Sequence, residues 1–187
     1  MREDRQHVLD SPMSYAIRQL NKSDLCSYRA LRLQALTECP AAFGATPATE
    51  QALGEAQLLS RFSGALGQAM WGGFDADGRL CASLGLYRDQ GEKTAHKGHL
   101  FAMYVAAPAR GQGLARALLE TAVAHGRVLK LRQLMLGCNA GNDKALRLYE
   151  QAGFRAYGLE PAALYVGGEY FDEVLMVQEL GRPLASP

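Results

Sequence analysis

A glycine-rich turn within residues 103–115 contains the residue types that bind an anion. An apolar run leads into a basic turn, and the turn continues directly into a stretch of strong helix formers that begins at Leu114. Backbone N–H groups at a helix start have no partner inside the helix, and the helix dipole favours negative charge there. Gly111 and Gly113 lack the Cβ atoms that would keep a phosphate from these donors, and Arg110 adds a cation. The turn therefore predicts a phosphate-binding site.

Two other glycine-rich phosphate-binding motifs do not fit this segment. A dinucleotide-binding fingerprint that starts at Gly111 needs a small residue at its sixth position, where the chain has Arg116. A Walker loop needs Gly-Lys followed by Ser or Thr, and the chain contains no such sequence. An ordinary strand-to-helix turn remains the alternative interpretation of this segment.

Strands and helices must hold this turn in place, and the spacing of apolar residues predicts them. Alternating apolar residues bounded by turn residues predict strands at 15–20, 70–74, 80–87, 98–105, 133–138, 154–159, 164–166 and 170–177. Helical spacing predicts helices from an N-cap at Ser23 to about Cys39, and over 49–62, 113–129 and 142–151, the last closed by Gly153. This order indicates a mixed sheet with helices on both faces.

Two motifs together resemble those of a known family. Residues 110–115 match the signature Q/R-x-x-G-x-G/A, and residues 142–154 match a second signature, N-x-x-A-x-x-L-Y-x-x-x-G-F, at the usual distance after the first. The chain is therefore identified as a member of the GNAT superfamily of N-acetyltransferases, of the bacterial single-domain type, over roughly residues 15–180. The resemblance implies an α/β fold with a mixed, mostly antiparallel sheet and helices on both faces. It also implies a splayed central strand pair, 98–105 and 133–138.

The same resemblance implies that acetyl-CoA binds in this split, and it assigns roles to individual residues. The positions that correspond to cofactor-binding residues are Met103, Val105, Arg110, Gly111, Gln112, Gly113, Leu114, Ala115 and Asn142. The Met103 amide would polarise the thioester carbonyl, and Tyr149 would protonate the leaving thiolate. Tyr149 could instead be a core aromatic, but its seven-residue spacing from Asn142 favours the catalytic interpretation.

The sequence departs from the family pattern at the position of the usual base. Many members carry a glutamate four residues before the motif valine, Val105, and here that position is Phe101. His99 lies two residues earlier and on the same strand face, and an unperturbed imidazole has a suitable pKa. Glu160, Asp172 and bulk water are the other candidates, so the base stays open.

Two residues of the N-terminal third could contact the acceptor. Arg32 belongs to the first predicted helix, and Phe43 belongs to the loop that follows it. They could line a substrate pocket, or they could be a salt-bridging arginine and a packed aromatic residue. The structural interpretation is favoured, because most such residues pack rather than bind.

The composition is that of a globular protein with a single domain. The chain has 187 residues, of which 48% are hydrophobic and 21% charged, and a formal net charge of +1. This balance gives no reason to expect nucleic acid or an acidic membrane as a partner, and no apolar run approaches the roughly 18 residues that span a bilayer. The four cysteines are scattered without a C-x-x-C pair, which predicts reduced thiols in the cytoplasm and no metal site.

The function expected from these observations is transfer of acetyl from acetyl-CoA to a primary amine by direct attack, in a monomer or homodimer. The amine could belong to a small molecule, an amino acid, a peptide or a protein. Residues 1–14 are expected to be a disordered extension, and residues 15–181 a single domain. The alternatives are a catalytically silent acyl-CoA-binding sensor or partner module and an enzyme that acetylates charged tRNA or protein N-termini. No pattern in the sequence identifies the acceptor.

Overall fold

The computed structural model describes residues 15–63 and 67–181, so the extension expected at 1–14 lies outside the described residues. The strands are β1 (Ala16–Gln19), β2 (Ala69–Phe74), β3 (Leu80–Arg88), β4 (Lys97–Val105), β5 (Gln133–Asn139), β6 (Arg155–Val166) and β7 (Glu169–Glu179). The helices are α1 (Leu25–Glu38), α2 (Pro47–Gln51), α3 (Glu55–Leu59), α4 (Leu114–Val128) and α5 (Asp143–Gln151), with 3-10 turns η1 (Lys22–Asp24), η2 (Pro40–Ala42) and η3 (Ala107–Ala109).

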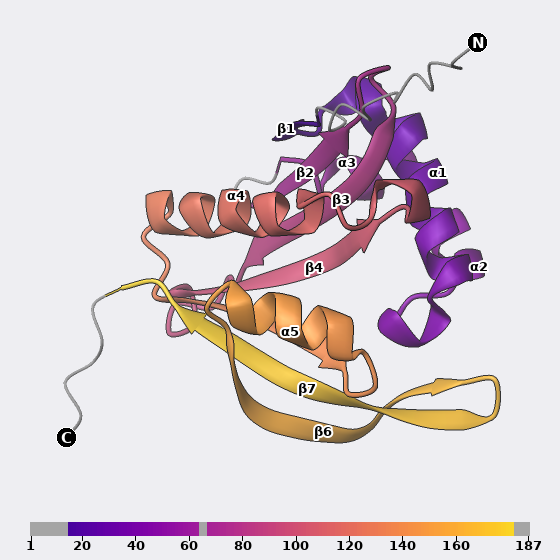
Figure 1. Cartoon of the computed structure of the whole chain (residues 1–187). Helices are drawn as coiled ribbons and strands as arrows, with labels where there is room; N and C mark the ends of the chain where they lie inside the picture. The colour runs from indigo at the N-terminus through magenta and orange to yellow at the C-terminus, as the bar shows by residue number, and fades with distance from the viewer. Residues whose placement is uncertain (1–14, 64–66, 182–187) are drawn as a thin grey trace, which may run out of the picture.

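The strands form one sheet in the order β1-β2-β3-β4-β5-β7-β6. Only the central pair β4–β5 is parallel among the pairs of described strands, and the others are antiparallel. Figure 1 shows α4 over β2–β4, α5 over the β7 half, and α1 with α2 on the opposite side of the sheet. The mixed sheet with helices on both faces is confirmed.

The central pair separates along its length. β4 and β5 pair at three positions, from Lys97 with Gln133 to His99 with Met135. Beyond these positions the two strands diverge, and the β6–β7 hairpin continues away from the upper half of the molecule (Figure 1). The last six residues of β4 therefore have no strand partner on the β5 side. The predicted splayed pair is confirmed.

A β-bulge interrupts β4 where it borders this split. The β3–β4 register shifts between Ser83 and Gly85, and Ala102 of β4 has a positive φ of 53°. The buried Ser83 hydroxyl donates a hydrogen bond of 3.0 Å to the Ala102 carbonyl, which satisfies a group that the bulge removes from the regular ladder. Ala102 packs with the core on the α1 side of the sheet, whereas the next residue, Met103, packs against the core under α4.

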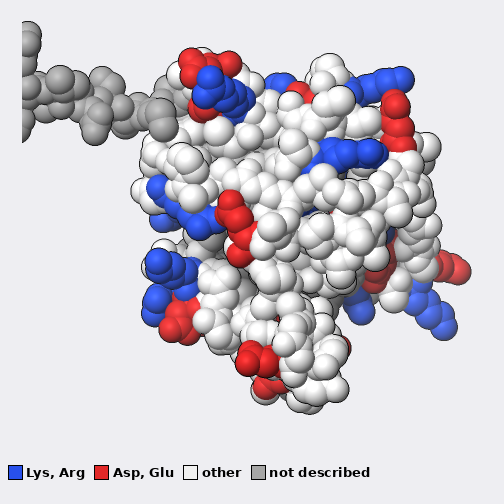
Figure 2. Space-filling view, turned by 90° about the vertical axis from the view of Figure 1, so that its right-hand side faces the viewer, with Lys and Arg blue, Asp and Glu red and all other residues white. Residues whose placement is uncertain are grey.

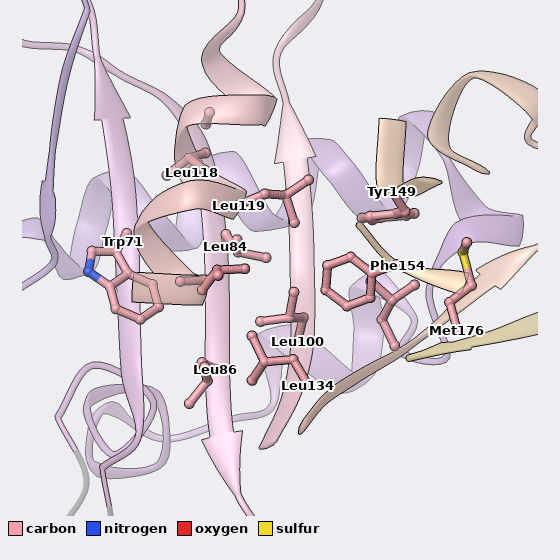
Figure 3. Close-up of a cluster of buried hydrophobic side chains, with 14 of the residues drawn as sticks. Trp71, Leu84, Leu86, Leu100, Leu118, Leu119, Leu134, Tyr149, Phe154 and Met176 are labelled. Carbon is pink, nitrogen blue, oxygen red and sulfur yellow. The ribbon is translucent and has the colours of Figure 1, made fainter. Parts of the chain in front are cut away.

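A continuous core holds the two halves of the split together. Figure 3 shows Leu118 and Leu119 of α4 above the leucines of the central strands, and Tyr149, Phe154 and Met176 on the β5–β7 side. All of these side chains belong to one buried cluster. Each fully buried leucine contributes about 1.5–3 kcal/mol relative to an exposed one, so α4 and α5 are firmly anchored on the sheet. A smaller cluster under α1 and α3 covers the opposite face.

Two predictions about helices are wrong in detail. The side-chain cap is Asn21 rather than Ser23, and it caps the 3-10 turn η1 that leads into α1: the Asn21 side chain accepts the Ser23 amide while Asp24 accepts the Asn21 amide. The helix expected over 49–62 is two short helices, α2 and α3, because Gly54 has an extended backbone (φ −69°, ψ 161°) between them. By contrast, Gly153 has a φ of 94° directly after the C-cap of α5, as the sequence predicts.

The end of the chain also differs from the sequence prediction. The two segments expected at 154–159 and 164–166 belong to one strand, β6, whose register against β7 shifts between Glu160 and Leu164. The irregularity contains Ala162, with a positive φ of 52°, and it explains why the alternation looks broken in the sequence.

The surface charge and the helices of the described residues can be compared with those of nucleic-acid-binding and membrane-spanning proteins. Figure 2 shows the side of the molecule with α1, α2 and the hairpin tip, where basic and acidic residues are interspersed without a broad patch of one sign among the described residues. In the two described ranges, every helix is too short or too polar to cross a membrane.

Candidate active site in the β4–β5 split

The divergence of β4 and β5 opens a cleft of about 620 Å³. Its walls come from α1, the loop after it, β4, the start of α4, β5, α5 and β7. Among the residues predicted to form the site, those that line the cleft are Met103, Val105, Arg110, Ala115, Asn142 and Tyr149. The fold thus brings residues from both motifs to one cavity.

The glycine turn itself lies next to the cleft. Gly111 and Gly113 both have a φ of 79°, and a Cβ added at either position would meet no atom within 4 Å. Gly113 is the N-cap of α4, and no side chain caps this helix start. The first N–H groups of α4 therefore adjoin open space, which suits an anion. The Leu114 side chain points away into the core, with 3% of its surface exposed.

The Arg110 and Gln112 side chains stabilise the turn. Arg110 Nε donates a hydrogen bond of 2.8 Å to the Val105 carbonyl, and Nη2 lies 3.3 Å from the Glu38 carboxylate. Gln112 Nε2 donates to the Pro108 carbonyl at 3.2 Å. The cation that the sequence assigns to phosphate binding thus has an anionic partner on α1 and ties the end of β4 to the turn.

Tyr149 lies in the last turn of α5 and faces the cleft. Its ring is 8% exposed and packs edge-on against Phe154, with 6.0 Å between ring centroids. Its hydroxyl makes no hydrogen bond to any residue in the described ranges. Burial, and secondarily the nearby Cys138, raise the pKa of Tyr149 well above its usual range. The phenol is therefore protonated at physiological pH and free to donate.

Asn142 is the N-cap of α5. Its side-chain oxygen accepts the Ala145 amide at 3.1 Å, which leaves the side-chain NH₂ as a donor. Seven residues make about two helical turns, so Asn142 and Tyr149 lie on the same side of α5, and both line the cleft.

None of the three side chains considered as a base lines the cleft. His99 does share a face with Phe101, as predicted, since the Tyr87 ring contacts both. However, His99 lies where β4 and β5 are still paired, and its Nε2 is 3.0 Å from Asp89.

The other two candidates are exposed and lie on the β6–β7 hairpin. Asp172 accepts the Ala162 amide at 2.8 Å and lines a separate, shallower hollow. Glu160 pairs with Glu173 in the register of β6 and β7.

Glu173 is a cleft residue that the sequence interpretation missed. It lies directly after Asp172, and alternation along β7 places the two side chains on opposite faces. Its carboxylate lies over Gly137 of β5, where a Cβ would be 2.5 Å from Oε2. Burial, and then the neighbouring Glu160, raise the pKa of Glu173 above its ordinary value. In the part of the chain that the structure describes, Glu173 has no hydrogen bond or ion pair.

Arg32 and Phe43 both line the cleft, and they also pack against each other. The Arg32 guanidinium carbon lies 4.6 Å from the centroid of the Phe43 ring. The Arg32 side chain is 9% exposed, and burial lowers its pKa. Its nearest carboxylate is Glu50 of α2, at 3.6 Å from Nε. The favoured structural interpretation is therefore incomplete, because a packed arginine also faces the cavity.

Across residues 15–63 and 67–181, no group of three or more His, Cys, Asp or Glu residues is placed to hold a metal ion. The free edge of β4 and the uncapped start of α4 offer hydrogen-bond donors along one side of the cleft, and the Asn142 amide at the start of α5 adds another, as an extended amide-containing and phosphate-containing molecule would need.

Comparisons with known proteins agree with this geometry. The chain is 27% identical over 106 residues to YwnH of Bacillus subtilis, which carries the provisional name phosphinothricin acetyltransferase; the match covers 57% of this chain and 65% of YwnH. It is 36% identical over 63 residues to a mycothiol acetyltransferase of Geodermatophilus obscurus, a match that covers 34% of this chain and 20% of that protein. The chain thus spans less than two thirds of the length of these relatives.

A solved structure and a family model complete the comparison. The crystal structure of a phosphinothricin acetyltransferase from Sinorhizobium meliloti in complex with acetyl-CoA superposes with a TM-score of 0.78, at 23% identity, over 90% of each chain. The model of the acetyltransferase (GNAT) family matches residues 34–154, which include the glycine turn, the asparagine cap and Tyr149. With more than half of its length matched, the chain belongs to the GNAT acetyltransferase family.

Proposed function

We propose that the protein transfers acetyl from acetyl-CoA to a primary amine. The observation that carries this proposal is the meeting of three features in one cleft: the unpaired edge of β4, the uncapped start of α4 and the free hydroxyl of Tyr149. Family membership supports the same reaction class.

We infer that one wall of the cleft binds acetyl-CoA mainly through the backbone. The N–H groups of the turn and of the first residues of α4, through Ala115, would hold the diphosphate. The backbone of Met103 and Val105 would bind the pantetheine arm like an added strand, and the Asn142 NH₂ would donate to the same arm. Arg110 would act mainly by fixing the turn, since Val105 and Glu38 already bind its guanidinium.

The chemical step needs two proton transfers and one donor for a developing oxyanion. Acetyl-CoA supplies an activated acyl group as a thioester. The Met103 amide is the proposed oxyanion donor, and Tyr149 is the proposed acid that protonates the leaving thiolate. Its raised pKa keeps the phenol in the donating form.

Glu173 is our candidate for the base that accepts the amine proton. An alkyl ammonium is not nucleophilic, so a proton must leave before or during attack. Glu173 is the cleft carboxylate with no partner in the described ranges, and its raised pKa brings it closer to the working range of a base at neutral pH. His99, Glu160 and Asp172 do not line this cavity, and a water-mediated path to any of them is the weaker proposal.

A catalytically silent module that binds acyl-CoA would need the same cofactor-binding residues. It would not need a side chain free to act as an acid or a base. The unpaired Tyr149 hydroxyl and the unpaired Glu173 carboxylate therefore favour an enzyme. The test is thiol release from acetyl-CoA with a panel of amino acids, polyamines, aminoglycosides and peptides. Turnover with at least one amine supports the proposal; micromolar binding of acetyl-CoA without turnover on any amine would support the silent module instead.

A further inference from the structure

A buried cluster of charged side chains connects the helical layer to the cleft. Glu50 is 1% exposed, and Arg61 Nη1 donates to its Oε1 at 2.6 Å. Arg32 Nε lies 3.6 Å from the other oxygen of Glu50, which is too far for a good hydrogen bond. The shorter contact of Glu50 is thus with Arg61, its other oxygen makes only the long ion pair with Arg32, and Arg32 is the member of the cluster that lines the cleft.

The cluster has an unbalanced charge. Two guanidinium groups share one carboxylate, and arginine stays protonated at every pH at which a protein is folded, so one positive charge remains. The other close neighbours, the Tyr28 hydroxyl and the Phe43 ring, carry no charge. Arg32 keeps only the long contact with Glu50, and an incompletely paired buried charge is costly, so a second anion beside Arg32 would stabilise the cluster.

The hydrogen-bond donors of Arg32 are also unused. Nε and Nη1 are buried without a partner, and no Arg32 nitrogen bonds to any residue of the described ranges. Phe43 covers a face of the guanidinium, and the donors of a guanidinium lie along its edge. The side chain is therefore held in place by packing, and it lines the cavity with hydrogen-bonding capacity that the described residues do not use.

Charged residues elsewhere in the cleft do not supply the missing anion. Arg110 and Lys144 are cations, and Arg110 is already paired with Glu38. Glu173 is anionic, but it makes no ion pair with Arg32. Lys144 is exposed and can be solvated by water, so Arg32 is the buried cation of the cleft without a hydrogen-bonded carboxylate in the described ranges, and Glu173 is the carboxylate there without a partner.

We propose that Arg32 binds a carboxylate of the acceptor, so that the acceptor is a primary amine that also carries a carboxylate, as in an amino acid. This inference rests on the proposed transfer to an amine. A carboxylate accepts hydrogen bonds from a guanidinium, and its single charge balances the single excess charge of the cluster. The unpaired Glu173 would face the amino group, so the two ends of a zwitterion would meet groups of opposite charge.

The experiment compares acids with neutral isosteres on the parent protein. The twenty common amino acids and their α-carboxamides are assayed for thiol release, and their binding to the protein saturated with coenzyme A is measured by calorimetry. We expect kcat/KM for the best acid to exceed that for its amide by about 10²-fold, because the amide leaves a buried guanidinium partly unpaired.

A pair of arginine variants tests whether Arg32 is responsible. Arg32→Met keeps the length and removes the charge, and it should abolish the preference for acids while the Kd of coenzyme A stays unchanged. Arg32→Lys should keep part of the preference, because a lysine retains the charge without the fork. The control is Arg29→Met on the same helix; Arg29 donates to the Leu53 carbonyl and does not line the cleft, so the preference should stay.

The possible outcomes separate this inference from the proposed function. Turnover of amides or of simple amines as fast as acids would overturn the carboxylate site and leave the acetyltransferase intact. Binding of an acid that depends on Arg32 but gives no turnover would support the carboxylate site and overturn the acetyltransferase. A preference for acids that persists in Arg32→Met would show that another group binds the carboxylate and would overturn the assignment.

Discussion

The two walls of the cleft are built from different parts of the chain and use different chemistry. One wall is a continuous stretch from the free edge of β4 through the turn to the start of α4, and it offers backbone N–H groups. The opposite wall is made of side chains from α1, the loop after it, α5 and β7. Backbone donors suit an invariant ligand, because they depend little on side-chain identity, whereas separate side chains can adapt to a particular acceptor.

This difference predicts different consequences for substitutions on the two walls. Changes on the backbone wall should alter binding of coenzyme A with little effect on the choice of acceptor. Changes on the side-chain wall, apart from Asn142 with its proposed contact to the pantetheine arm, should alter the rate of chemistry or acceptor preference with little effect on binding of coenzyme A. The substitutions that follow test this division.

The largest effect is expected at Tyr149. Tyr149→Phe keeps the ring that packs on Phe154 and removes the hydroxyl, so kcat should fall by about 10²–10⁴, the range for a positioned acid, with an unchanged Kd for acetyl-CoA. Single-turnover kinetics avoid masking by product release. Tyr157→Phe on β6, outside the cleft, is the control. Single-turnover rates near the parental value would show that Tyr149 is not the acid.

A second substitution, Glu173→Gln, should lower kcat/KM by about 10²-fold and change its pH dependence. The pKa of Glu173 is raised above 4.5, and only the ionised form accepts a proton, so the parental rate should fall as pH drops through that raised pKa. In the variant, the remaining pH dependence of the rate should come only from deprotonation of the acceptor amine. Asp172→Asn, on the adjacent residue outside the cleft, should behave like the parent. An unchanged profile in Glu173→Gln would exclude Glu173 as the base.

On the backbone wall, Gly113→Ala should weaken binding of coenzyme A by about tenfold. The added methyl would enter the open space in front of the α4 start, where we place the diphosphate. Because Gly113 has a φ of 79°, the substitution also strains the backbone by about 1–2 kcal/mol. Gly78→Ala is matched for this strain, since Gly78 has a φ of 75° and equally open surroundings in the β2–β3 turn. Equal loss of binding in both variants would show that strain alone is responsible.

The same division explains how much of the site could be predicted from the sequence. The backbone wall is contiguous, and a glycine turn before a helix has few structural solutions, so its residues can be identified from one short segment. Tyr149 and Asn142 share one helix, so the seven-residue spacing fixes their common face. The divergence of β4 from β5 follows from the family resemblance and not from the local pattern.

The rest of the side-chain wall could not be predicted in this way. Asp172 and Glu173 are adjacent carboxylates, and only the β7 register shows that Glu173 faces the cleft. The incomplete hydrogen bonding of Arg32 depends on its sharing the single carboxylate of Glu50 with Arg61, an arrangement among residues far apart in the sequence. A helix pattern predicts which face is buried, but not which buried polar group lacks a partner.

The smallest effect is expected for Ser83→Ala. This substitution also tests most directly whether the bulge in β4 shapes the backbone wall. Ser83 does not line the cleft; its hydroxyl donates to the Ala102 carbonyl and supports the bulge immediately before Met103. Loss of this bond leaves a buried carbonyl unsatisfied, which should cost about 1–3 kcal/mol of unfolding free energy.

If the bulge positions the Met103 amide, kcat should also fall a few-fold, less than on removal of a whole oxyanion donor, at an unchanged Kd for acetyl-CoA. Thr121→Val is the control, because it removes a hydroxyl that donates to the Ala117 carbonyl on α4, far from the bulge. Thermal unfolding and single-turnover rates should therefore separate the pair: Thr121→Val should stay near the parental stability and rate, because the Ala117 carbonyl is still within a regular helix, whereas Ser83→Ala should lose both. A parental rate in a destabilised Ser83→Ala would show that the bulge shapes the sheet without placing the catalytic amide.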